Sequence, residues 1–192
     1  MQMYQALSKA ELESLMFKST AMCLGYDAEA AETQSKIRIS WPTDANASAS
    51  NPGWSYGEDV VFLRITPTNE TYTMLENTDY TIDENGEFVE RVNVTRCYAV
   101  NWFIYGFNAM DNAYKIKRAL LRTAVRRLMA DKHVFVLPNI DEPIRNDELN
   151  DRQWWHRCDL TARFYEGVVV DYAAEAIAEM PNIEIRTDKA EQ

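Results

Sequence analysis

The sequence predicts an α+β fold in which two helices pack on a mainly antiparallel β-sheet. Apolar and polar residues alternate in several runs, which is typical of strands that bury one face. The longest run extends from about Phe88 to Tyr105, and Asn85-Gly86 before it is a strong signal for a hairpin turn. Two further segments, from Ser8 to Gly25 and over residues 109–130, instead repeat apolar residues at helical spacing.

Length and composition favour a single domain over residues 1–192. A chain of 192 residues falls in the range of one domain, and 46% hydrophobic residues is ordinary for a globular protein. The formal charge of −10 argues against binding DNA with the whole surface, because such domains are usually basic. No run approaches the ~18 apolar residues of a membrane span, so we expect no membrane partner.

The first helix begins at a capping box. The Ser8 hydroxyl can accept a hydrogen bond from the backbone of Glu11, and the Glu11 carboxylate can reach back to Ser8. Leu7 and Leu12 stand where a hydrophobic staple would place them, and Gly25 can end the helix.

Strands account for most of the remaining chain. Lys36 to Trp41 alternates and stops at a proline, and Asp59 to Thr66 does the same. Residues 43–57 form a long polar loop between them, a length that is often functional. In the C-terminal half we expect strands at His133 to Leu137, Gln153 to Tyr165 and Val168 to Tyr172, with an acidic connector over 139–151. After them we expect a short helix or irregular chain at Ala173 to Met180 and an edge strand at Ile183, Ile185 and Thr187. A polar tail over 187–192 ends the chain.

The second helix, residues 109–130, is strongly basic on one side. Asn108 is a good N-cap, and Asp111 suits the positive end of the helix dipole. The side expected to lie on the sheet carries Ala113, Ile116, Leu120, Leu121, Ala124, Val125 and Leu128. The opposite side carries a cationic stripe of Lys115, Arg118, Arg122 and Arg126.

This stripe belongs to an otherwise acidic chain. Residues 111–132 hold 7 of the 20 Lys and Arg residues but 2 of the 30 acidic ones, which leaves 13 basic and 28 acidic residues elsewhere. Such polarisation suits charge-complementary contact between copies of the chain, or with a neighbour. Two alternatives stay open, a solvated helix face without a partner and a nucleic-acid-binding adaptor that uses the basic helix 109–130.

The tryptophan doublet raises a question of burial. Adjacent residues on a strand point to opposite faces, so Trp154 and Trp155 cannot both face one core. One of them needs cover from a helix, a loop or another subunit. Trp102 and Tyr105, in contrast, are expected to pack in the core.

Catalytic, cofactor and metal-binding patterns are missing from the sequence. It contains no G-x-S-x-G, H-E-x-x-H or P-loop motif. Cys23, Cys97 and Cys158 lack paired spacing, which indicates reduced thiols. His156 could share a strand face with Cys158, but two ligands do not make a metal site. We therefore expect no enzyme, no cofactor and no metal.

Three segments resemble the tailed-bacteriophage neck or tail terminator family. The first is Trp102 to Asn108, continued by Asp111 to Ala113 and Ile116 to Leu120. The second is Gln153 to Leu160, running into Ala162 to Glu166, and the third is Gly57 to Arg64. Together they cover much of residues 36–166, with the loop 43–57 and the C-terminal tail outside.

The resemblance implies a tail-terminator-like fold and a structural, non-enzymatic protein of the virion neck, assembled in the host cytoplasm. It implies a homo-oligomeric ring, six-fold by family expectation, at the head–tail junction. That ring would cap the tail tube and join it to the connector or head-completion protein, with genomic DNA only in the lumen. The subunit interface is then predicted at Lys115, Arg118, Arg122, Arg126, Trp154 and Trp155, and the structural corner at Tyr105, Gly106, Asn108 and Asp111.

Overall fold

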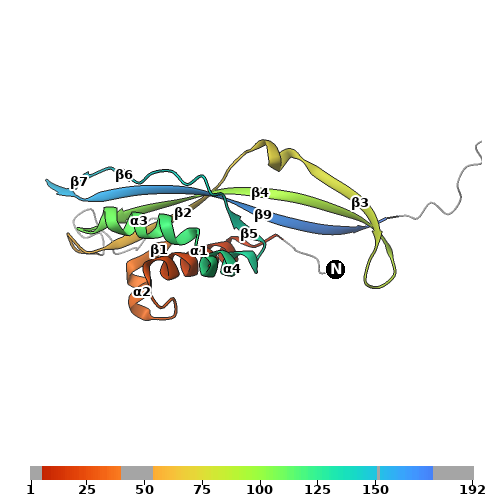
Figure 1. Ribbon diagram of the computed structural model, residues 1–192, viewed down its shortest axis with the longest axis horizontal. Helices are drawn as coiled ribbons and strands as arrows, with labels where there is room; N and C mark the ends of the chain where they lie inside the picture. Colours follow the sequence, from red (N-terminus) through yellow and green to blue (C-terminus); the bar gives the residue numbers. More distant parts are fainter. Residues whose placement is uncertain (1–5, 40–53, 151, 175–192) are drawn as a thin grey trace, which may run out of the picture.

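The computed structural model describes residues 6–39, 54–150 and 152–174, and it has the predicted α+β architecture (Figure 1). Its helices are α1 (Lys9–Leu24), α2 (Ala31–Lys36), the 3-10 helix η1 (Thr71–Met74), α3 (Ala109–Leu120) and α4 (Thr123–Ala130). Its strands are β1 (Ile37–Ile39), β2 (Val60–Pro67), β3 (Glu76–Ile82), β4 (Phe88–Tyr105), β5 (Val134–Val136), β6 (Ile144–Arg145), β7 (Glu148–Asn150), β8 (Gln153–Trp155) and β9 (Arg157–Ala173).

Two long antiparallel strands, β4 and β9, form the spine of the molecule. Their register runs from Val89 opposite Ala173 to Tyr105 opposite Arg157. β3 pairs with the first half of β4 and β2 with its second half, while β1 adds to β2 in parallel. β5 and β6 pair with β9, and β7 and β8 form a separate two-stranded hairpin. The sheet is therefore mainly antiparallel, as predicted.

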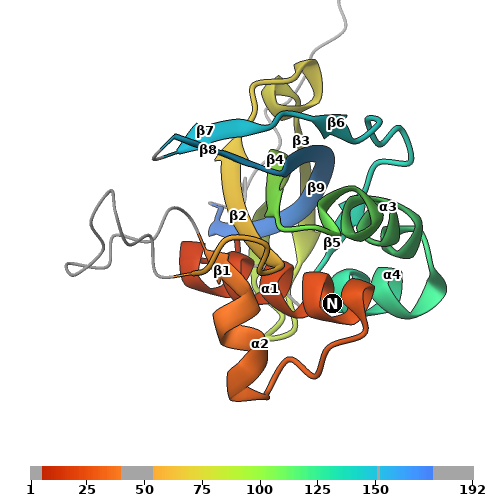
Figure 2. The same ribbon diagram turned by 90° about the vertical axis from the view of Figure 1, so that its left-hand side faces the viewer.

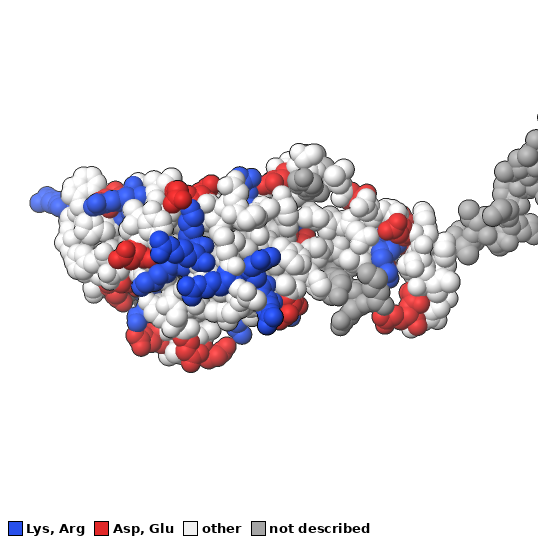
Figure 3. Space-filling model, in the orientation of Figure 1, with Lys and Arg blue, Asp and Glu red and all other residues white. Residues whose placement is uncertain are grey.

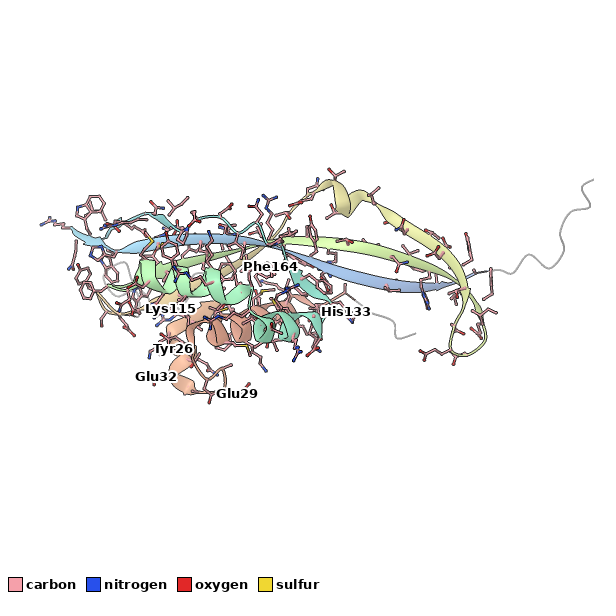
Figure 4. All side chains as sticks on the ribbon, viewed as in Figure 1. Tyr26, Glu29, Glu32, Lys115, His133 and Phe164 are labelled. Carbon is pink, nitrogen blue, oxygen red and sulfur yellow. The ribbon has the colours of Figure 1, made fainter. Side chains whose placement is uncertain are left out.

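The main core lies between the sheet and the helices. α1, α3 and α4 cover one face of the sheet, and the β7–β8 hairpin lies on its other side (Figures 1 and 2). Trp102 of β4 and Phe164 of β9 are fully buried, and Phe164 lies between the sheet and the helices in Figure 4. A smaller cluster on the other face joins Val60, Phe62 and Tyr105. Each fully buried large side chain contributes about 2 kcal/mol relative to an exposed one.

The first helix follows its sequence signals closely. The Ser8 side chain accepts from the Glu11 backbone, the Glu11 carboxylate accepts from the Ser8 backbone, and Gly25 ends α1 with a φ of +80°. The capping box and the C-terminal glycine are both confirmed. Neither α1 nor any other helix of the described residues is both long and apolar enough to cross a bilayer.

The prediction of one continuous helix over 109–130 was wrong, because the chain breaks between α3 and α4. Arg122 takes an extended ψ of 147°, which interrupts the helix. In an unbroken helix Val125 would lie about 180° around the axis from Ile116. The break brings Ile116 and Val125 into the same core and exposes Leu121 and Ala124, which were expected to be buried.

Other elements differ from the prediction in number or extent. The described residues form four α-helices instead of two, since α2 adds to the broken second helix. β9 continues through Gly167, where two strands were expected, and β6 and β7 occupy the predicted acidic connector. β3 was not predicted, because the apolar alternation in residues 76–82 is weak. The expected edge strand at 183–187, and all but residues 54–57 of the loop 43–57, lie outside the described residues.

The three cysteines are free and buried, which confirms the prediction of reduced thiols. Burial raises the pKa of Cys23 to about 12 and that of Cys158 to about 11. The thiolate is the reactive form, so we expect iodoacetamide at pH 8 to alkylate these two thiols more than ~100-fold slower in the native protein than in denaturant. Mass spectrometry of timed samples measures this, and native-state alkylation of Cys23 at the denatured rate would contradict its burial.

Candidate subunit interface

The chain turns sharply at Gly106, where β4 ends and α3 begins. Gly106 has a φ of +113°, a conformation that L side chains rarely adopt. A Cβ at this position would lie 2.3 Å from Asp59 Oδ1 and 2.7 Å from the carbonyl oxygen of Glu58. The predicted corner therefore requires glycine.

Asp59, which directly precedes the neighbouring strand β2, holds the start of α3. Its carboxylate accepts hydrogen bonds from the Asn108 backbone N–H at 3.1 Å and from Asn108 Nδ2 at 2.8 Å. Asn108 is the N-cap residue of α3, as predicted, but its side chain makes no capping hydrogen bond. Asp59 places a negative charge near the positive end of the helix dipole instead, together with Asp111 in the first turn. Sequence reasoning missed Asp59, whose partner is 49 residues away.

All three segments that carry the family resemblance meet at this corner. The Gly106 N–H donates to the carbonyl oxygen of His156 at 3.2 Å. The Phe107 ring covers Gly57 so closely that a Cβ on Gly57 would lie 2.3 Å from it. The Tyr105 hydroxyl donates to the Glu148 carboxylate at 2.7 Å. The corner thus fixes where α3, and the charges on it, stand relative to the sheet.

The four cations of the predicted stripe lie together on the outer surface of α3 and α4, which we call the cationic surface. Figure 3 shows Lys and Arg gathered there. Lys115, labelled in Figure 4, donates to Asn112 Oδ1 at 3.3 Å, and the Arg118 guanidinium lies 5.8 Å from the Tyr114 ring centroid. Within the described residues, none of the four members of this surface forms an ion pair with a carboxylate: Lys115, Arg118, Arg122 and Arg126.

Most other basic side chains of the described chain are neutralised by carboxylates. Lys117 on α3 pairs with Glu142, for example. Eight more, all outside α3 and α4, form ion pairs: Lys9, Lys18, Lys36, Arg91, Arg96, Arg145, Arg157 and Arg163. The cationic surface is therefore a concentration of uncompensated positive charge on a chain that is acidic as a whole.

The cationic surface also has a hollow and apolar neighbours. A hollow of about 460 Å³ lies between α1 and α3, lined in part by Cys23, Asp111 and Arg122. Leu121 is 44% exposed at the break between the helices, and Met22 on α1 is 45% exposed. Interfaces commonly combine Arg with exposed apolar side chains in this way.

The two adjacent tryptophans have different surroundings. Trp155 is partly buried, with Trp54 and Tyr56 each packed edge-on against it at a centroid distance of 5.8 Å. Trp154 is 61% exposed and lies opposite the equally exposed Leu149 across the β7–β8 hairpin. The cover that one tryptophan needed comes from the chain itself, so only Trp154 of the pair presents its ring to solvent.

The His156 and Cys158 side chains do not form a site together. His156 Nδ1 lies 3.7 Å from Asp147 Oδ1, whereas the Cys158 thiol lies 3.6 Å from the Met110 sulfur. Arg145 hydrogen-bonds to Asp147 and holds the pKa of that carboxyl below its usual value. In residues 6–39, 54–150 and 152–174, no three His, Cys, Asp or Glu side chains converge as metal ligands would.

Comparison with protein families supplies the biological context of this geometry. The family model described as "Phage neck terminator protein" matches residues 24–190. The match extends beyond residues 36–166, and it includes the loop 43–57 and most of the C-terminal tail, which the resemblance had left outside. A search of curated proteins found no match.

Proposed function

The chain belongs to the phage neck terminator family, and on that basis we propose that its copies form a closed ring that caps the tail tube and joins it to the connector. Family membership makes it a structural protein of the virion neck, which associates with other phage head and tail proteins. Our proposal concerns the ring, its lumen and the surfaces through which neighbouring copies contact each other.

The observation that carries the proposal is the cationic surface. Its four cations are exposed and form no ion pair with a carboxylate of residues 6–39, 54–150 or 152–174, and the formal charge of the whole chain is −10. A second copy of such a chain offers an excess of carboxylates, and contact between them brings opposite charges together. Because the cationic and acidic regions are different parts of one surface, the contact is heterologous, and a heterologous contact forms a ring when its rotation closes and an open filament when it does not. Six copies are the family expectation.

The acidic body suits a ring through which DNA passes. Carboxylates repel the phosphate backbone, so a lumen lined by them does not hold the DNA that it surrounds. The faces of the ring would contact the connector or head-completion protein on one side and the tail tube on the other. Trp154 and Leu149, exposed on the β7–β8 hairpin, are suited to one of these contacts.

We expect the purified chain to assemble, as its concentration rises, into a closed species with a mass that is an integer multiple of 22.2 kDa. Replacing Arg122 with glutamate should weaken this assembly at least ~tenfold, because it places like charges in contact. Light scattering across a concentration series measures the mass, and electron microscopy shows whether the species is a ring.

The matched control is Arg64→Glu, the same charge reversal on the opposite face of the sheet. Arg64 is exposed on β2, between the buried Leu63 and the partly buried Ile65, which both pack in the main core. Its reversal should leave assembly unchanged, and both variants should keep the wild-type circular dichroism spectrum. Equal assembly by Arg122→Glu and the wild type would remove the cationic surface from the interface, and a wild type that stays monomeric would refute the ring.

A further inference from the structure

Part of the sheet projects beyond the helices as an arm, defined by residues 76–95 and 167–174. It consists of β3, the first half of β4 and the second half of β9, and it extends away from the helical body (Figure 1). No α-helix of the described residues covers it, and none of its residues belongs to the main core cluster. A small sheet depends on burying a hydrophobic face for its stability, so a partner that covers the arm would stabilise it.

The two faces of the arm differ in character. On one face Arg91 and Asp171 form a two-point ion pair, with distances of 2.7 Å and 2.6 Å. The other face continues the apolar pattern of the core strands, and toward the tip it is exposed, with Tyr80 63% and Ile82 67% accessible. Tyr80 stacks on Phe88 there, with the ring planes 9° apart. The far end of the arm therefore presents exposed apolar side chains.

The same end is strongly acidic. Residues 76–90, the arm hairpin, contain six Asp and Glu residues and no Lys or Arg. Figure 3 shows acidic side chains gathered at this end of the molecule, away from the cationic surface. Asp83 shapes the turn by accepting the backbone N–H groups of Asn85 and Glu87. The hairpin thus combines a negative tip with an apolar flank.

We infer that the arm hairpin of one copy docks on the cationic surface of the next copy. This inference rests on the proposed ring and names the two surfaces that would close it. The hairpin has six carboxylates, and residues 109–132 have seven cations against two acids. The exposed apolar side chains of the tip, Tyr80 and Ile82, match Leu121 and Met22 beside the cations.

The arm hairpin is suited to dock on the cationic surface of a second copy, and not on that of its own chain. The arm hairpin and the cationic surface lie on opposite halves of the long axis, so they do not meet within one molecule (Figures 1 and 3). A contact between two different ends of an elongated subunit runs head to tail, and such a contact generates a ring when its rotation closes. Each copy then uses both surfaces once, and no cation or hairpin is left over when the ring closes.

A charge exchange tests the contact. The arm variant Glu84→Lys/Glu87→Lys changes the formal charge of the hairpin from −6 to −2 and places two cations at its tip. The surface variant Arg118→Glu/Arg122→Glu changes the formal charge of residues 109–132 from +5 to +1 and places two carboxylates on the cationic surface. Each variant alone should assemble at least ~tenfold more weakly than the wild type, because like charges oppose each other. An equimolar mixture should regain assembly, since each variant now offers the other a complementary surface. Light scattering of the separate and mixed proteins provides the measurement, and circular dichroism confirms that each variant folds.

The possible outcomes separate this inference from the proposed ring. If the wild type forms rings and the arm variant assembles equally well, the proposed ring is supported and the arm is rejected as its contact. Loss of assembly by both variants without recovery in the mixture would also reject the pairing of these two surfaces. Absence of any wild-type oligomer would instead overturn the ring itself. Recovery in the mixture alone, with neither single variant assembling, supports the arm contact.

Discussion

Replacing Gly106 with alanine is expected to lower the free energy of unfolding by about 3–5 kcal/mol. The φ of +113° costs an alanine ~1–3 kcal/mol in strain. The new Cβ would also lie 2.3 Å from Asp59 Oδ1, which must move and give up its hydrogen bonds to Asn108, each worth about 1 kcal/mol. Urea titration followed by tryptophan fluorescence measures the change.

Gly86→Ala is the matched control for this substitution. Gly86 also has a positive φ, +83°, but an added Cβ would meet no atom within 4 Å. Gly86→Ala should therefore lower the free energy of unfolding only by the cost of the left-handed backbone conformation, about 1–2 kcal/mol. Equal losses from Gly106→Ala and Gly86→Ala would mean that the contact with Asp59 contributes nothing to the corner.

Local signals predicted those elements whose ends are fixed by neighbouring residues. The capping box at Ser8 and the glycine at position 25 gave the bounds of α1, and the Asn85-Gly86 turn gave the start of β4. The break between α3 and α4 left no such signal, because it arises when Val125 is drawn into a core formed by distant strands. β3 also lacks a local signal, because its sequence alternates only weakly and its pairing with β4 compensates for this.

The candidate site divides in the same way. Helical spacing predicted that Lys115, Arg118, Arg122 and Arg126 are exposed, and they are, although the helix breaks at Arg122. Asp59, which anchors the corner, belongs to a segment 49 residues away in the chain, and only the fold brings it to Asn108. The arm depends on where the helices end relative to the sheet, which no local pattern encodes.

A buried carboxylate marks the place where the arm joins the body. Glu166 on β9 is 1% exposed, and its oxygens accept hydrogen bonds from the Leu7 backbone N–H and, at 2.7 Å, from the Tyr98 hydroxyl. The Arg96 guanidinium lies 3.5 Å away. Glu166 thus ties the segment before α1 to both spine strands at the base of the arm.

Replacing Glu166 with alanine is expected to lower the free energy of unfolding by about 3 kcal/mol, because it leaves the buried Tyr98 hydroxyl and the Leu7 N–H without an acceptor. Glu166→Gln keeps one acceptor oxygen and should lose about half as much. Glu87→Ala, on the exposed turn of the arm, is the control and should change stability by less than ~0.5 kcal/mol. Urea titrations of the three variants give the values.

The pH dependence of stability gives a second readout of the same contact. Burial, and then the hydrogen bond to Glu166, raise the pKa of Tyr98 above its ordinary value. A group whose pKa is higher in the folded state stabilises the protein below its unfolded pKa, about 10 for tyrosine, and loses that contribution as the pH rises above it. The wild type should therefore lose stability above about pH 10 more steeply than Tyr98→Phe.

The stability of Glu166→Gln should fall with a steepness between these two, because the substitution removes the charge beside the hydroxyl but leaves Tyr98 buried. Identical alkaline profiles for the wild type and Tyr98→Phe would show that this hydroxyl is solvated, and the base of the arm would then lack the buried anchor described above.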